Sequence, residues 1–180
     1  MSTQLQSYRF SDSEILRPTC DVAFKAMFSR SKELVIDLLQ SAYLFNPAIE
    51  SVDYINTELS AERDGAKTCR LDVAVKLADG TVIDVEVQTH QDPGIKKRSI
   101  AYASKLLSSQ IECGEGGEQP DVMALFLLQH EIFPELPNQW MRSFELRDRC
   151  GCFLEERALR IDFVELLMAK RLHAEGNSVF

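Results

Sequence analysis

Four polar side chains lie on two neighbouring stretches of alternating sequence between residues 70 and 90: Asp72, Asp84, Glu86 and Gln88. The dipeptide Asp79-Gly80 between these stretches is a strong signal for a two-residue β-hairpin turn. Such a turn would set Asp72 nearly opposite Val87 and next to Glu86, so that the two carboxylates approach each other. Adjacent carboxylates repel unless a cation lies between them, and hard oxygen ligands suit Mg²⁺ or Mn²⁺. The hairpin is therefore a candidate site for a divalent metal.

The same alternation is also typical of an edge hairpin with one solvated face. Asp84, Glu86 and Gln88 would then be surface residues, while Ile83 and Val85 on the opposite face pack into the core. The spacing alone leaves both interpretations open.

Helices and strands on either side of the hairpin must position these residues. Apolar residues at helical spacing predict helices within residues 17–29 and 31–45, with Thr19 as the first N-cap and Pro47 ending the second helix. A long helix is predicted from Ile95 to Gly114. The later elements are a central buried strand, a further strand, and a strand that leads into a helix, within residues 122–133, 141–149 and 158–170. This order predicts a mixed α/β domain around one sheet.

Composition sets the class of protein. The chain of 180 residues is 45% hydrophobic and 27% charged, which is typical of a globular protein with a real core. We expect an N-terminal arm over residues 1–17 and a single domain over residues 18–180. The net charge of -8 argues against a protein that coats nucleic acid, but not against a local basic groove. Five cysteines without framework spacing favour reduced thiols and a cytoplasmic location, and the sequence predicts no signal peptide and no membrane partner.

Four stretches, in order, resemble the Rpn family of recombination-promoting nucleases, which are PD-(D/E)XK nuclease family transposases: RPTCDVAFKAMF, RLDVAVKLADGTVIDVEVQTH, KRSIAYASKLLSSQIECGE and ALRIDFVELLM. The most specific part of the match is a set of spaced residues: Asp21, Phe24, Lys25, Glu86, Gln88, Arg98 and Tyr102. The resemblance implies a restriction-endonuclease-like α-β-β-β-α-β core, with a mixed central sheet flanked by helices. It also implies metal-assisted hydrolysis of phosphodiester bonds, in which a water attacks phosphorus in line.

The resemblance implies a metal site in which Asp72 and Glu86 are ligands, assisted by the backbone carbonyl of Val87. Asp21 resembles an acid on the first helix of this superfamily. It would be a further metal ligand or would hold Lys25.

Gln88 stands where many members of the superfamily have a lysine, although Glu-x-Gln is usual in this family. A glutamine can hydrogen-bond but carries no charge. Another cation should then offset the charge that develops during hydrolysis, and Lys25 and Arg98 are the candidates.

Basic residues at the start of the predicted third helix are candidates for contact with the phosphate backbone of DNA: Lys96, Lys97 and Arg98. Tyr102 lies one helical turn after Arg98, on the same face. The alternative is an ordinary solvated helix face.

Other polar and aromatic residues carry weaker signals. His90 could take part in proton transfer and Gln110 could touch DNA, but each is more simply a bystander. Trp140, Phe144 and Phe153 are expected to fill the core rather than to stack on bases.

Two functions remain in view. The first is a DNA endonuclease dependent on Mg²⁺ or Mn²⁺, without an organic cofactor, and a homodimer is expected because cutting both strands needs two sites. The second is a nuclease-fold protein that binds nucleic acid or protein and has lost useful catalysis. The candidate catalytic residues Asp72, Glu86 and Gln88 favour the first function, whereas the net charge and the missing lysine favour the second.

Overall fold

The computed structural model describes most of the chain after residue 19, in six ranges: 20–43, 49–59, 69–110, 119–136, 138–156 and 158–176. The expected arm over residues 1–17 lies outside these ranges, as do Thr19, Pro47 and Gly114, so the expected roles of those three residues lie outside the described residues too.

The helices and strands follow one another as α1 (Asp21–Phe28), α2 (Lys32–Tyr43), β1 (Val52–Tyr54), β2 (Glu58–Leu59), β3 (Cys69–Arg70), β4 (Val73–Leu77), β5 (Val82–Gln88), α3 (Ile95–Ser109), β6 (Val122–Leu128), β7 (Met141–Glu145), β8 (Leu159–Glu165) and α4 (Leu166–Ala174). The expected strand that leads into a helix is confirmed by β8 and α4, and the expected buried strand by β6. Helix α3 ends at Ser109, earlier than the sequence predicted. No helix in the described ranges is long and apolar enough to cross a membrane.

Six strands form one mixed sheet in the order β1-β4-β5-β6-β8-β7. Strands β5, β6 and β8 are parallel neighbours, while β1-β4, β4-β5 and β8-β7 pair antiparallel. Parallel strands need a crossover connection, and α3 supplies it between β5 and β6. Strands β2 and β3 form a separate two-stranded sheet.

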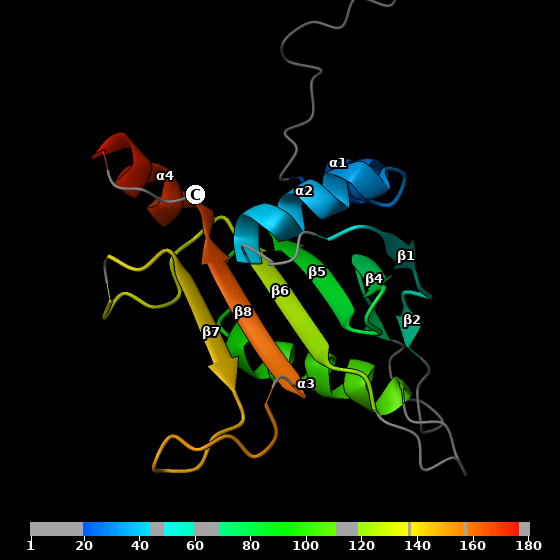
Figure 1. Cartoon of the computed structure of the whole chain (residues 1–180). Coiled ribbons are helices and arrows are strands. Elements are labelled where there is room, and N and C mark those ends of the chain that lie inside the picture. Colours follow the sequence, from blue (N-terminus) through cyan, green and yellow to red (C-terminus); the bar gives the residue numbers. More distant parts are fainter. Residues whose placement is uncertain are drawn as a thin grey trace, which may run out of the picture.

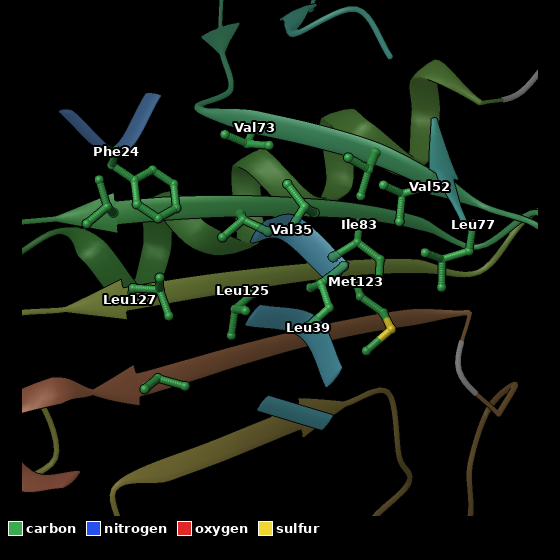
Figure 2. Packing of buried hydrophobic residues seen from close by; sticks show 14 residues of the cluster. Phe24, Val35, Leu39, Val52, Val73, Leu77, Ile83, Met123, Leu125 and Leu127 are labelled. Atoms are coloured by element: carbon green, nitrogen blue, oxygen red, sulfur yellow. The ribbon is translucent and has the colours of Figure 1, made fainter. Parts of the chain in front are cut away.

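Helices cover the sheet on both faces (Figure 1). Helices α1 and α2 place Phe24, Val35 and Leu39 on one face, against apolar side chains from β4, β5 and β6. Figure 2 shows this layer, in which Leu39 lies beside Leu125 and Met123. Helix α3 covers the opposite face through Ile95, Ala103 and Leu106. Both faces of β5 are therefore buried, so the interpretation as a solvated edge hairpin is wrong.

The turn between β4 and β5 differs from the expected one by a single residue. The backbone N–H of Leu77 donates to the carbonyl of Thr81 at 2.8 Å, so the loop contains Ala78, Asp79 and Gly80 rather than two residues. Gly80 has a φ of 92°, which suits the left-handed position of a three-residue hairpin loop. The extra loop residue moves the register by one.

The register of β4 against β5 pairs Val73 with Val85 and Ala74 with Asp84. Continued by one residue, it sets Asp72 opposite Glu86, whereas the sequence analysis had set Asp72 opposite Val87. Since paired residues share one face of a sheet, this shift brings the two acids to the same side.

Two aromatic residues expected in the core are substantially exposed. Phe144 is 46% exposed on the edge strand β7, although its ring packs against Phe133 and Phe163. Phe153 is exposed in the loop after β7, with Arg147 over its ring. Trp140 is partly buried against two apolar clusters, as expected.

A buried hydrogen bond ties α2 to the sheet. The hydroxyl of Tyr43 donates to Oδ2 of Asp162 at 2.8 Å, and Asp162 on β8 is 0% exposed. Arg160 donates to the other oxygen of Asp162 at 2.9 Å. The link fixes the last turn of α2 over β8, the strand next to the edge strand β7.

We expect the substitution Tyr43→Phe to lower the free energy of unfolding by about 1–2 kcal/mol, because it leaves one oxygen of a buried carboxylate without its donor. Tyr54→Phe is the matched control, since its hydroxyl binds an exposed backbone carbonyl, that of Phe28. Its effect should stay below about 0.5 kcal/mol. Urea unfolding of both variants measures the difference, and equal effects would contradict a special role for the buried link.

Candidate active site

Asp72 and Glu86 are joined by a reciprocal pair of hydrogen bonds. The backbone N–H of Asp72 donates to Oε1 of Glu86 at 2.9 Å, and the backbone N–H of Val87 donates to Oδ2 of Asp72 at 3.0 Å. The chain bends at Asp72, between β3 and β4, which frees its backbone from the strand ladder. Each acid is thus held by the backbone of the neighbouring strand.

Burial makes the ionised forms of these acids unfavourable. Glu86 is 3% exposed, and burial together with the charge of Asp72 raises the pKa of Glu86 to about 8. Burial also raises the pKa of Asp72, although the ammonium of Lys25 and the N–H of Val87 oppose this shift. A cation next to both carboxylates would stabilise their ionised forms.

Lys25 on α1 reaches the hairpin and binds two acids. Its Nζ lies 2.8 Å from Oδ1 of Asp72 and 2.9 Å from Oδ1 of Asp21. Although burial lowers the pKa of Lys25, its hydrogen bonds to Asp72 and Asp21 raise that pKa overall. Of the two roles expected for Asp21, the structure displays the contact with Lys25.

Gln88 connects Glu86 to a second cation. Its Nε2 lies 3.4 Å from Oε2 of Glu86, and its Oε1 accepts a hydrogen bond of 2.7 Å from Arg98 at the start of α3. Arg98 also forms an ion pair with Asp92. Lys25 and Arg98 were the two candidates for a compensating cation, and the structure brings both of them to the hairpin.

The remaining candidates lie around α3. Tyr102 packs with the apolar cluster under β4, and its ring centroid is 5.9 Å from the guanidinium carbon of Arg98. Lys96 and Lys97 are exposed on the first turn of α3. His90 is exposed and its Nδ1 lies 2.8 Å from the hydroxyl of Thr89. Gln110 is the C-cap residue of α3, so the length of the helix separates it from Arg98.

Two features of this site were not predicted from the sequence. Asp92 was not named, although an acid just before the Pro93-Gly94 dipeptide is a usual helix-entry signal, and its Oδ1 accepts from the N–H of Gly94 at 2.7 Å. The second feature is the burial of Asp84, which is 1% exposed and lies between Ala74 and Ala124 on the neighbouring strands. Neither carboxylate oxygen of Asp84 has a hydrogen-bond partner in the described part of the chain. Alternation alone could not separate a solvated acid from this one.

The donor set fits a hard divalent cation. Two carboxylates meet in a place where burial raises the pKa of both, and oxygen ligands are those that Mg²⁺ and Mn²⁺ prefer. Among the residues that the structure describes, no group of three or more His, Cys, Asp or Glu side chains is arranged to hold a metal ion. A cation here would accordingly be bound by two acids, with backbone or water oxygens completing its shell.

The family of the chain is established by comparison with known families. The model of the PD-(D/E)XK nuclease family transposases matches residues 18–179. Because this match covers most of the chain, the chain belongs to that family. The curated proteins and the solved structures that were searched gave no match. The observed order α2-β1-β4-β5-α3-β6 confirms the expected α-β-β-β-α-β core of the nuclease-like fold.

Asp84 should make the stability of the metal-free protein depend on pH. Burial first, and then the charges of Glu86 and Asp72, raise the pKa of Asp84 well above its usual value. Above the unfolded pKa near 4, the unfolded chain releases a proton that the folded chain retains, so stability falls as pH rises toward the folded pKa. Asp84→Asn removes this dependence on pH, because an amide does not titrate. As pH rises, the free energy of unfolding of Asp84→Asn should therefore increase relative to that of wild type by up to about 1.4 kcal/mol per pH unit.

Chemical unfolding in EDTA between pH 4.5 and 8 measures this difference. Asp79→Asn on the hairpin loop is the control, because its carboxylate has a donor, the backbone N–H of Thr81. Parallel pH profiles for wild type and Asp84→Asn would contradict the buried, neutral state of Asp84.

Proposed function

We propose that the chain is a divalent-metal-dependent endonuclease that hydrolyses phosphodiester bonds in DNA. The observation that carries this proposal is the pair Asp72 and Glu86, which are buried together, hydrogen-bonded to each other's strands and flanked by cations on both sides. Membership of a nuclease-type transposase family supports the reaction class.

In this proposal Asp72, Glu86 and the backbone carbonyl of Val87 hold Mg²⁺ or Mn²⁺, without an organic cofactor. When bound, the cation supplies Lewis-acid stabilisation of negative charge on the scissile phosphate. Asp21 acts through Lys25, since its carboxylate fixes the ammonium that contacts Asp72.

Gln88 orients groups at the site but supplies no charge. Its amide lies between Glu86 and Arg98, so it holds the Arg98 guanidinium close to the acids. Lys25 on the other side provides the second positive charge. Lys25 and Arg98 together replace the lysine of many superfamily members, because their positive charges offset the negative charge that develops on the phosphate.

DNA contacts extend from the site along the first turn of α3, through Lys96 and Lys97, with Tyr102 supporting Arg98 from below.

We expect a homodimer, because cutting both strands requires two sites. We also propose that residues 18–180 form one nuclease-like domain. A cytoplasmic location fits the free thiols of Cys20, Cys150 and Cys152.

The site is tested by plasmid cleavage in Mg²⁺ and in Mn²⁺. Wild type should cut, and Asp72→Asn and Glu86→Gln should each lose at least about 10²-fold in rate, because a ligand worth several kcal/mol of transition-state stabilisation is gone. Glu155→Gln, an exposed acid near the opposite end of the sheet, is the control and should cut like wild type. Equal cutting by all variants would contradict the site. A folded wild type that cuts no DNA form would favour the alternative of a catalytically inactive binding module.

The role of Lys25 is tested in the same assay. Lys25→Gln should lower kcat by about 10²-fold or more, because it removes a preorganised positive charge, and Lys25→Arg should recover part of the rate. Lys32→Gln is the matched control, since Lys32 forms an ion pair with the exposed Asp53 at 2.7 Å. A change confined to KM or to thermal stability would show that Lys25 only supports the fold.

A further inference from the structure

One row of residues crosses the sheet from the candidate site to the edge strand β7. The register pairs Glu86 of β5 with Phe126 of β6, Phe126 with Phe163 of β8, and Phe163 with Arg142 of β7. Phe126 and Phe163 pack in the cluster under α3, so the whole row lies on the face that carries Glu86. Three strand spacings of about 4.8 Å separate the ends of the row, which is roughly 14 Å.

The Arg142 end of this row holds two cations on one aromatic ring. The guanidinium carbon of Arg142 lies 4.5 Å from the centroid of Phe133, and Nζ of Lys96 lies 4.0 Å from the same centroid. The backbone that carries this ring is held by Oε1 of the buried Glu165, which accepts hydrogen bonds from the N–H groups of Ile132 and Phe133 at 2.6 and 3.0 Å. Lys96 of α3, Arg142 of β7 and Phe133 of the loop after β6 thus form one small basic cluster.

Neither of these positive charges is neutralised. In the ranges that the structure describes, no carboxylate lies within ion-pair distance of Lys96 or Arg142. The guanidinium of Arg142 donates only to the carbonyl of Leu136 at 3.2 Å, and its buried Nε has no partner there. The Phe133 ring positions the two cations and leaves their charge available in a chain of net charge -8.

Arg147 illustrates the contrasting arrangement. Its guanidinium carbon also lies over an aromatic ring, 3.7 Å from the centroid of Phe153, but its NH2 group binds Glu145 at 2.8 Å. Arg98 and Arg160 likewise combine a cation–π contact with a neutralising acid, whereas the two cations on Phe133 have none among the described residues.

We propose that Lys96 and Arg142, held on Phe133, bind a backbone phosphate of the DNA substrate away from the bond that is cut. This inference rests on the proposed function and extends it by one binding contact. Each strand of B-DNA carries one phosphate per 3.4 Å of helix axis, so roughly 14 Å spans at most about four nucleotides. The contact is to phosphate, so it adds affinity and orientation without sequence preference.

Salt-dependent DNA binding tests the inference. Fluorescence anisotropy with a labelled duplex, in Ca²⁺ rather than Mg²⁺, gives Kd over a range of salt concentrations. Removing one phosphate contact should lower the slope of log K against log salt by about one, so the double variant Lys96→Gln/Arg142→Gln should show this change, and each single variant should show a measurable part of it. Arg147→Gln changes the net charge equally and should leave the slope unchanged.

Arg142→Lys is the control for a folding defect in Arg142→Gln. It keeps the positive charge, so the slope of log K against log salt should stay close to that of wild type. Cleavage in Mg²⁺ at saturating DNA should show an unchanged kcat and a raised KM for Arg142→Gln. Wild-type cutting with unaltered slopes in Lys96→Gln and Arg142→Gln would overturn this inference alone. A wild type that neither binds nor cuts DNA would overturn it together with the proposed function.

Discussion

The register of one hairpin is the constraint on which the candidate site depends. A three-residue loop at 78–80 sets Asp72 opposite Glu86, and the strand pairing then lets each acid accept a hydrogen bond from the backbone of the other's strand. Because side chains alternate between faces, a shift of one residue would turn these acids to opposite sides of the sheet. The left-handed conformation of Gly80, which is strained for most other residues, thus determines the hydrogen bonds that the carboxylates of Asp72 and Glu86 accept several residues away.

The second requirement is to hold acids in a place that opposes their charge. Helix α3 covers Glu86 and Asp84, while α1 brings Lys25 from the other side of the sheet and Arg98 comes from the start of α3. Water therefore does not solvate these acids, and the two nearby cations do not fully balance their negative charge. A further positive charge would stabilise the ionised acids, and for the same reason the pKa of Glu86 is raised even though two cations are near.

Much of this arrangement could be predicted from the sequence. The alternating apolar residues and the Asp79-Gly80 signal predicted the hairpin, and the apolar run within residues 122–133 predicted β6. The family resemblance indicated Lys25 and Arg98 as the cations near the acids. The loop length could not be read, because an Asp-Gly pair serves both two- and three-residue loops. The burial of Asp84 was equally hidden, since it depends on Ala74, Ala124 and α3, which come from other parts of the chain. Arg142 was overlooked for the same reason: only the register across four strands connects it to Glu86.

The outer strand β1 has a consequence for how copies of the chain could meet. It has only three residues, and the exposed Asp53 on it binds Lys32 of α2. Short edge strands with charged side chains resist the addition of a further strand, because a neighbouring chain would have to desolvate those charges. The edge next to the candidate hairpin thus resists β-sheet extension, which leaves helix surfaces, loop surfaces and the opposite edge for contact between copies of the chain.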